Sequence, residues 1–312
     1  MLIQILLQKY YSEYCREQTK GNPAEKVFFK NKNNQQVKRN YYYLVAGLQD
    51  ITLDIHKLSM GQVEFRQELK TALHPKDYKL TEILFYPFDN SNLLNLLKKT
   101  DLDLDPRGNF DQAILEENIK ETTGELPSYM DKFIIAFKED EPVIAGLSHE
   151  NQLTALFYRY TQNLKVDFLP EWFRFNRDLN NLLTAMICRK YDIPHENQII
   201  GDDETSDAIR KSHARDFGLS AEIPWLDDLL NIAKNDDVQE REKAIDQLRW
   251  KYLEEVTFFE YFTIDKILAF TLKLGMVERW LAIDHEHGSK MFKELLLELK
   301  SSYKLPETFT EK

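Results

Sequence analysis

The sequence predicts an all-α protein, and three observations support this fold class. First, a mostly apolar set of residues near the C-terminal end recurs at the three- and four-residue spacing of one helix face. This set is Ile264, Ile267, Leu268, Thr271, Leu274, Val277 and Leu281. Second, similar helical patterns follow one another along most of the chain. Third, 312 residues include only 10 Gly and 10 Pro, too few for the many tight turns of an all-β protein.

Residues 1–40 differ from the rest of the chain in charge. They carry 8 Lys and Arg against 3 Glu, a net charge of +5, whereas the remainder carries −16. The run 31–40, NKNNQQVKRN, is polar apart from Val37. We therefore expect a basic, poorly ordered N-terminal extension, and the alternative is a basic tail that contacts a partner.

The next part of the chain predicts one extended segment and then a series of helices. Residues 41–54, YYYLVAGLQDITLD, are rich in β-favouring residues and predict a short extended segment. Residues 59–73 predict a helix, and residues 77–99 predict two helices separated by Pro87. Residues 101–108, DLDLDPRG, predict a loop, and further helices are expected over 110–165. Pro170 and Pro224 each suit the start of another helix, and Pro194 follows the end of the first of these two.

Residues 249–300 predict three successive helices with wide apolar faces. Thr263 is the expected N-cap of the middle helix, and Gly288 is the expected end of the following turn. Upstream lies an aromatic wall formed by Trp250, Leu253, Phe258, Phe259, Tyr261 and Phe262. Downstream lies a second stripe formed by Met291, Phe292, Leu295, Leu296 and Leu299. We expect Trp280 to be buried beside the aromatic wall.

The net charge and the number of cysteines argue against two kinds of function. A net charge of −11 argues against nucleic acid as a partner, because phosphate contacts need clustered Lys and Arg. The two cysteines, Cys15 and Cys188, suit a reducing compartment and exclude a four-thiolate zinc site. Residues 1–7, MLIQILL, lack the basic flank of a signal peptide, and no apolar run reaches 18 residues. We therefore expect a cytoplasmic protein without a membrane span.

Several short patterns resemble chemical sites, and each has a simpler explanation. Asp101, Asp103 and Asp105 match three calcium positions of an EF-hand, but Pro106 and Gln112 break the pattern, which favours a solvated loop. The run 285–287, HEH, offers metal ligands that point apart on a helix and lack a third partner. Cys188 lies among apolar residues, which favours a small buried hydrophobe. No phosphate-binding loop, nucleophile elbow or zinc-protease motif is present.

The strongest enzyme signal is the run 202–207, DDETSD. Aspartate-rich runs of this kind coordinate magnesium in all-helical isoprenoid synthases, so Asp202, Asp203 and Asp207 are candidate ligands, with Asp236 and Asp237 as a second cluster. Against this interpretation, the run is expected in a loop, its spacing is one residue off the usual D-D-x-x-D, and no Arg-rich diphosphate clamp is visible. We expect no catalytic, cofactor or metal site, and the magnesium-dependent enzyme stays as the alternative.

A weak internal repeat suggests related helical modules. Residues 89–94, DNSNLL, and residues 178–183, DLNNLL, share the pattern D-x-x-N-L-L, and both follow aromatic residues. On a helix the Asp and Asn of each copy are neighbours, so a hydrogen bond between them across one turn is expected.

The phrase over residues 258–284, FFEYFTIDKILAFTLKLGMVERWLAID, together with the two D-x-x-N-L-L copies, resembles the stalk-to-ring adaptor of A/V-type ATPases, known as their C-type subunit in prokaryotes and d-type subunit in eukaryotes. It is still more similar to a bacterial family of uncharacterised proteins encoded beside V-type ATPase genes. The resemblance covers roughly residues 41–306, and it leaves residues 1–40 without a counterpart and 307–312 as a short tail. Gln49 stands where proline is expected in relatives.

The resemblance implies a funnel-like, all-α assembly of about three related helical modules. It also implies a non-catalytic adaptor that joins the central stalk of a V-type ATPase to its proteolipid ring and transmits torque for ion transport. Such a protein would be peripheral at the inner face of the cell membrane. The acidic block 201–260, with 16 acidic and 8 basic residues, would suit a basic partner surface.

Overall fold

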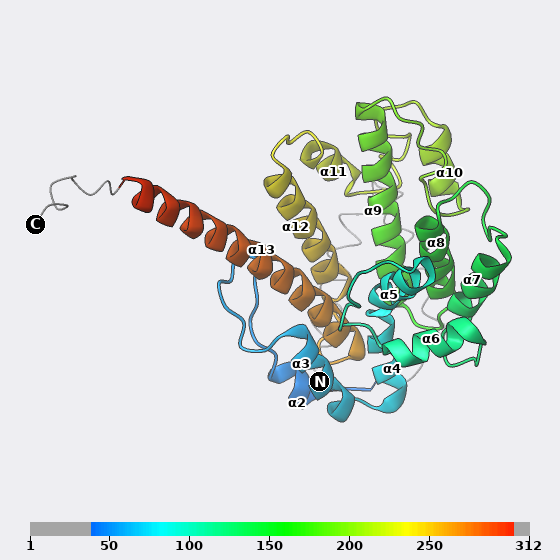
Figure 1. Cartoon of the computed structure of the whole chain (residues 1–312), viewed down its shortest axis with the longest axis horizontal. Helices are drawn as coiled ribbons and strands as arrows, with labels where there is room; N and C mark the ends of the chain where they lie inside the picture. Colours follow the sequence, from blue (N-terminus) through cyan, green and yellow to red (C-terminus); the bar gives the residue numbers. More distant parts are fainter. Residues whose placement is uncertain (1–38, 303–312) are drawn as a thin grey trace, which may run out of the picture.

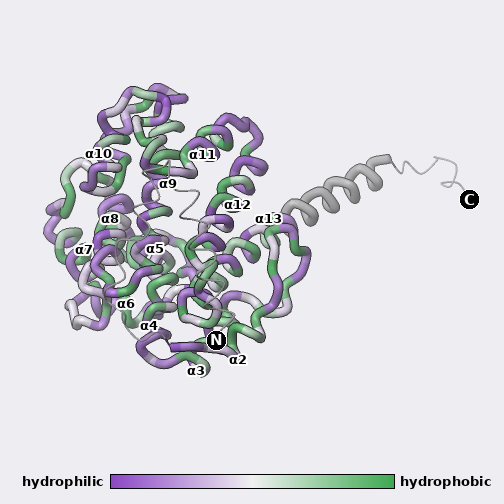
Figure 2. The backbone as a smooth tube through the Cα atoms, turned by 180° about the vertical axis from the view of Figure 1, so that it is seen from behind, coloured by the Kyte–Doolittle hydropathy of each residue, from purple (hydrophilic) through white to green (hydrophobic). Residues whose placement is uncertain are grey.

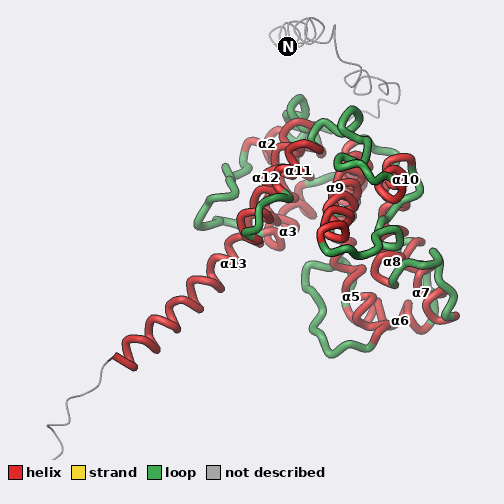
Figure 3. The backbone as a smooth tube through the Cα atoms, turned by 90° about the horizontal axis from the view of Figure 1, so that it is seen from above, coloured by secondary structure: helices red, strands yellow, loops and turns green. Residues whose placement is uncertain are grey.

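The computed structural model describes residues 39–302, and the side chains of residues 39–284. The predicted N-terminal extension, up to residue 38, and the short C-terminal tail lie outside the described residues. Within the described range the chain forms twelve helices and no strand, which confirms the all-α prediction (Figure 3). The helices are α2 (Tyr42–Ala46), α3 (Gln62–Ala72), α4 (Pro75–Ile83), α5 (Tyr86–Lys98), α6 (Gln112–Lys120), α7 (Ser128–Glu139), α8 (His149–Gln162), α9 (Phe168–Lys190), α10 (Glu204–Lys211), α11 (Leu226–Ile232), α12 (Val238–Val256) and α13 (Ile264–Ser302).

Polar side chains and prolines begin many of these helices, as the sequence leads one to expect. The side chains of Asp111, Ser148, Asp203 and Asp237 each accept a hydrogen bond from a backbone N–H in the first turn of the helix that follows. These bonds satisfy donors that the helix itself leaves without a partner. Proline occupies the first turn of α4 and of α5, where its fixed φ suits the helix and its missing N–H costs nothing.

The helices pack around one hydrophobic core that draws side chains from both ends of the described chain. Helix α8 packs against α5, α7 and α9, and α9 also contacts α10 and α12. The first half of α13 packs against α3, α4 and α12, so helices from early and late parts of the described chain lie side by side (Figure 1). Hydrophobic and hydrophilic residues alternate along the helices, as amphipathic packing requires (Figure 2). The core is therefore continuous from Leu44 to Leu274.

The contact between α3 and α13 depends on a glycine. The Gln62 side chain donates to the carbonyl of Thr271 at 3.0 Å, and its backbone N–H donates to the Glu278 carboxylate at 2.7 Å. A Cβ atom at Gly275 would lie only 2.6 Å from Gln62 Nε2. Gly275 thus lets the two helices approach closely, although glycine within a helix is otherwise unfavourable.

The extended segment predicted for residues 41–54 is wrong. Residues 42–46 form α2 and the rest of the segment is loop. A strand would need a neighbouring strand to satisfy its backbone groups, and the described chain supplies none. A short helix satisfies part of these groups internally and still buries Leu44, so tertiary context overrides the β propensity of the aromatic residues.

The C-terminal region forms fewer helices than predicted. The apolar stripe from Ile264 to Val277 is buried as expected, but α13 continues through Gly288 as a single helix of 39 residues. One interior glycine costs about 1 kcal/mol, too little to end a helix whose flanking residues favour it. Thr263 directly precedes α13, and its hydroxyl donates to the Glu260 carboxylate at 2.8 Å. The side chains of the run 285–287 and of the downstream stripe lie outside the described residues.

Trp280 is buried as predicted, but four of the six residues of the expected aromatic wall are exposed. Phe258, Phe259, Tyr261 and Phe262 are exposed in the turn between α12 and α13. The polar contact of Trp280 is instead the carboxylate of Asp246 on α12. Trp280 lies on the buried face of α13, whereas the four aromatic residues of the turn lie outside any helix and do not reach the core.

Candidate functional site

The acidic run begins in a loop at residues 202–203 and continues on α10 at residues 204–207. Asp203 is the N-cap of α10, and it accepts hydrogen bonds from the Ser206 N–H at 2.9 Å and from the Arg177 guanidinium. Burial opposes ionisation of Asp203, but these two donors outweigh it and lower the pKa of the carboxyl. The predicted loop setting is therefore wrong for residues 204–207.

The other two aspartates of the run, Asp202 and Asp207, form ion pairs. Asp207 pairs with Arg210 at 2.9 Å and with Lys211 at 3.0 Å, and Asp202 pairs with Arg159 at 3.2 Å. The second acidic cluster is also engaged, because Asp236 pairs with Lys190 and Asp237 is the N-cap of α12. Among the residues whose side chains are described, no three His, Cys, Asp or Glu groups gather as a metal site would require. The run acts as a helix cap and an ion-pair cluster.

The other sequence candidates have structural roles as well. Cys188 is buried, as expected for a small hydrophobe. Asp101 and Asp103 are exposed in their loop, whereas Asp105 binds the guanidinium of Arg107. The calcium-like spacing therefore belongs to a loop whose third carboxylate already has a cationic partner.

The first D-x-x-N-L-L copy holds the loop that precedes α6. Asn92 on α5 binds both backbone groups of Asp105: its Nδ2 donates to the carbonyl at 2.9 Å, and its Oδ1 accepts from the N–H at 2.7 Å. The Asp89 carboxylate accepts from the backbone N–H groups of Asn109 and Phe110. Burial raises the pKa of Asp89 to about 6 despite these donors.

The second copy, on α9, holds the loop that follows this helix in the same way. Asn181 binds both backbone groups of Ile200, donating to the carbonyl at 2.6 Å and accepting from the N–H at 2.9 Å. Asp178 accepts from Arg177, which also binds the α10 cap Asp203. The predicted Asp–Asn bond within each motif is therefore replaced by bonds to the following loop. Each copy fixes a loop and the start of the next helix, as related modules would.

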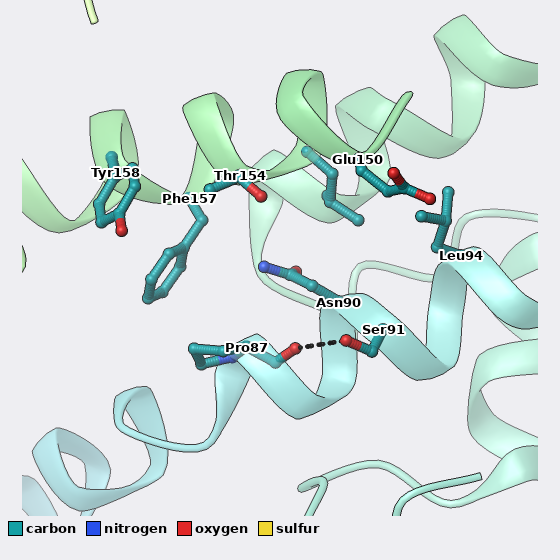
Figure 4. A pocket seen from close by; sticks show the side chains of 9 residues that line it. Pro87, Asn90, Ser91, Leu94, Glu150, Thr154, Phe157 and Tyr158 are labelled. Atoms are coloured by element: carbon teal, nitrogen blue, oxygen red, sulfur yellow. Dashed lines mark hydrogen bonds between the residues drawn. The ribbon is translucent and has the colours of Figure 1, made fainter. Parts of the chain in front are cut away.

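A hollow of about 270 Å³ lies between α5 and α8 (Figure 4). Two helix faces line it: Pro87, Asn90, Ser91 and Leu94 from α5, and Glu150, Leu153, Thr154, Phe157 and Tyr158 from α8. Asn90 Oδ1 accepts from the Tyr129 hydroxyl at 2.8 Å, and Figure 4 shows the amide nitrogen directed towards α8. The hollow thus offers an N–H donor between walls that mix apolar side chains with polar ones, including the Glu150 carboxylate.

Exposed aromatic side chains lie on α2 and in the turn between α12 and α13, and Tyr42 and Phe262 bring the two segments into contact. We call Tyr42, Tyr43, Tyr261 and Phe262 the aromatic surface; their exposed fractions are 59%, 95%, 50% and 36%. Two contacts join α2 to the α12–α13 turn here. The rings of Tyr42 and Phe262 lie 4.7 Å apart, and the Tyr41 N–H donates to the Phe262 carbonyl at 2.7 Å. Two segments more than 200 residues apart in sequence therefore build one surface.

A family model described as "Protein of unknown function (DUF2764)" matches residues 38–303. The chain belongs to this family. The DUF2764 match includes the aromatic surface, both D-x-x-N-L-L copies and the acidic run. No curated protein and no solved structure matches the chain. In the described part of this DUF2764 protein, no helix is both long enough and apolar enough to cross a membrane.

Sequence reasoning misses the two surface features of this DUF2764 chain for different reasons. Residue type alone places Tyr42 and Tyr43 in an extended segment, and it places Tyr261 and Phe262 in an aromatic wall beside Trp280. One sequence feature could have separated these residues from the buried helix face. The run 258–262, FFEYF, lacks helical periodicity, although it directly precedes a strongly periodic helix. Asn90, in the hollow, carries no signal, because an isolated amide on a helix is ordinary.

Proposed function

We propose that this chain is a non-catalytic adaptor in the rotor of a V-type ATPase, where it joins the central stalk to the proteolipid ring. Its location would be the cytoplasmic face of the cell membrane, to which it attaches through the ATPase complex. The partners are thus protein surfaces, and the work is mechanical: the adaptor carries torque between the stalk and the ring during ion transport.

The observation that carries this proposal is the aromatic surface. Aromatic side chains are enriched at protein interfaces, because they bury a large area at little cost in conformational entropy. Exposed aromatic rings in contact, such as those of Tyr42 and Phe262, are less common on ordinary monomers than single exposed rings. Tyr43 is almost fully exposed on a five-residue helix, where its ring contributes little to the stability of the core. A role in binding a partner accounts for this arrangement.

Two further features support the adaptor. The phrase 258–284, which carries the resemblance to the ATPase adaptor, contributes Tyr261 and Phe262 to the aromatic surface and continues into α13. With 39 residues, α13 is about 59 Å long at 1.5 Å per residue. Its first half packs against the body, and its second half extends away from the body (Figure 1). A long helix anchored at one end suits a protein that connects two larger assemblies.

The test is recovery of the adaptor with the ATPase from its native cell. A tagged full-length chain is expressed at its natural level, membranes are solubilised under conditions that keep the ATPase intact, and the eluate is identified by mass spectrometry. We expect the stalk and ring proteins in the eluate. Their repeated absence, when the same preparation contains an intact ATPase, would overturn the proposal.

A matched pair of variants tests the aromatic surface itself. Tyr43→Asp with Tyr261→Asp should lower recovery of the ATPase proteins by tenfold or more, because charges replace the contact area. The control is the double variant Tyr191→Asp with Ile193→Asp. Both of these residues follow the end of α9, and their exposed fractions are 65% and 52%. Equal recovery of both variants would place the docking surface elsewhere.

A further inference from the structure

The hollow between α5 and α8 contains a buried hydrogen-bond donor without a partner. Asn90 is 9% exposed, and its Oδ1 accepts from the Tyr129 hydroxyl at 2.8 Å. Its Nδ2 donates to no group among the residues whose side chains are described. Figure 4 shows this nitrogen directed from α5 across the hollow towards α8. A buried N–H group without a partner is unfavourable, so a ligand that supplies an acceptor here gains a hydrogen bond.

The second D-x-x-N-L-L copy shows that such a module does not need an amide at this position. Leu179 follows Asp178 in the second copy, as Asn90 follows Asp89 in the first. Leu179 is fully buried in the hydrophobic core, whereas Asn90 lines the hollow. The bond to Tyr129 uses only the amide oxygen of Asn90. The fold therefore accounts for Oδ1 and gives no role to Nδ2.

The size and the walls of the hollow define the apolar part of a ligand. The volume is about 270 Å³, whereas an apolar cavity of about 150 Å³ already binds benzene. Leu94 of α5 and Leu153 and Phe157 of α8 supply apolar contacts from both helix faces. A molecule with one small ring or branched chain and a short polar group therefore fits this space.

The charges around the hollow favour a neutral ligand. Among the residues that line it, the only charged group is the carboxylate of Glu150. Glu150 pairs with Lys98 at 2.9 Å, but Lys98 does not line the hollow. An anion would therefore meet a carboxylate of the same sign and no cation in the walls. A neutral group that carries both an acceptor and a donor suits these walls better.

We propose that the hollow binds a small neutral molecule in which a carboxamide is joined to an apolar group. The carboxamide oxygen accepts from Asn90 Nδ2, and its N–H group donates to the Glu150 carboxylate or the Thr154 hydroxyl. The apolar group lies against Phe157. This ligand site is independent of the adaptor role, because it requires no contact with the ATPase.

The experiment uses the ¹⁵N-labelled full-length chain and two probes, benzamide and 3-methylbutanamide. Two-dimensional NMR follows the side-chain amide signal of Asn90, which is assigned by its disappearance in Asn90→Asp. We expect at least one probe to shift this signal with a dissociation constant of about 1 mM, as for other ligands of this size. Benzoate has the shape of benzamide but is an anion, and it should bind about tenfold more weakly or worse. The absence of a shift with either amide, or equal affinity for benzoate, would overturn the proposal.

Variants test whether the probes bind in the hollow, with affinities taken from the NMR signals of benzamide itself. Asn90→Asp keeps an oxygen for the Tyr129 hydroxyl but removes the N–H donor, and it should weaken binding about tenfold. Thr154→Phe fills the hollow from a partly exposed position of α8 and should weaken binding by at least about as much. The control is Thr184→Phe, the same change at a partly exposed position of α9 outside the hollow, which should bind benzamide like the wild type. Unchanged affinity in Thr154→Phe, or an equal loss in Thr184→Phe, would also overturn the proposal.

Discussion

The indole nitrogen of Trp280 donates a hydrogen bond to the carboxylate of Asp246, 2.9 Å away. Both side chains are buried, and the guanidinium groups of Arg249 and Arg279 bind the same carboxylate. This pair joins α12 to α13. A buried carboxylate with three donors fixes the relative position of the two helices. If the helices moved apart, the negative charge of Asp246 would remain buried without its donors, which is unfavourable.

We expect Trp280→Ala to lower the free energy of unfolding by roughly 3–5 kcal/mol, as for other large-to-small core changes. Trp280→Phe should keep most of the packing but remove one donor from Asp246, at a cost of about 1–3 kcal/mol. Urea unfolding measures both values. Trp250→Phe is the matched control, because Trp250 makes the same kind of bond to Glu254 at 2.9 Å on an exposed helix face. Equal losses for the two Trp→Phe variants would show that burial of the bond is unimportant.

Asp89 should make the stability of the fold decrease as pH rises. Burial raises the pKa of Asp89 to about 6, whereas an unfolded aspartate titrates near 3.9. The folded state therefore binds the extra proton between about pH 4 and pH 6. This contribution is fully present below about pH 4 and is lost as the pH passes about 6. In Asp89→Asn the loss disappears, so the wild type should lose roughly 2–3 kcal/mol relative to this variant between about pH 4 and pH 7. Asp103→Asn, at an exposed position of the nearby loop, should follow the wild type; a parallel curve for Asp89→Asn would disprove the assignment.

The two D-x-x-N-L-L copies should contribute equally to stability. Asn92→Ala and Asn181→Ala each remove the partners of one backbone N–H and one carbonyl. We expect a loss of about 2–4 kcal/mol for either variant, since each unsatisfied group costs roughly 1–3 kcal/mol. Ser91→Ala on α5 is the control, because its hydroxyl only donates to a carbonyl of its own helix. A large loss at one copy and none at the other would contradict the common role.

We expect the carboxylates of the acidic run to stabilise α10 and not to bind a metal ion. Asp203→Ala removes the helix cap and one partner of Arg177, and should cost about 1–2 kcal/mol. Asp202→Asn should cost less than about 0.5 kcal/mol, because its ion pair is exposed. Chemical unfolding gives both values, and calorimetric titration with Mg²⁺ gives the second readout. Tight Mg²⁺ binding that is lost in the Asp202→Asn and Asp203→Asn double variant would instead support the enzyme alternative.

Residues 1–39 should be dispensable for folding. A chain that starts at Asn40 loses only the exposed ion pair between Arg39 and Asp77 from the described body, which contributes about 0–1 kcal/mol. We expect its thermal midpoint to stay within a few degrees of the full-length value. A fall of about ten degrees in the calorimetric midpoint, or loss of solubility, would show that the segment is part of the folded core.

The fold class and much of the helix map follow from the sequence alone, because both depend on local periodicity and on caps. The stripe from Ile264 to Val277 is buried as its spacing predicts, and Trp280 continues that face. Pro87 lies in the first turn of α5, as the fixed φ of proline favours. These features depend on residues within a few turns of one another, which is the range that a sequence pattern reports.

Which side chains meet across the chain depends on the packing of distant helices. The aromatic surface forms only because α2 lies beside the α12–α13 turn, and the Asp246 site only because Arg279 and Trp280 reach α12. Likewise, Asn92 and Asn181 bind loops 13 and 19 residues further along the chain instead of the aspartates of their own motifs. A buried polar group bonds with whatever partner the packing brings within reach. The spacing of residues in the sequence therefore does not predict which partner a buried polar group will bind.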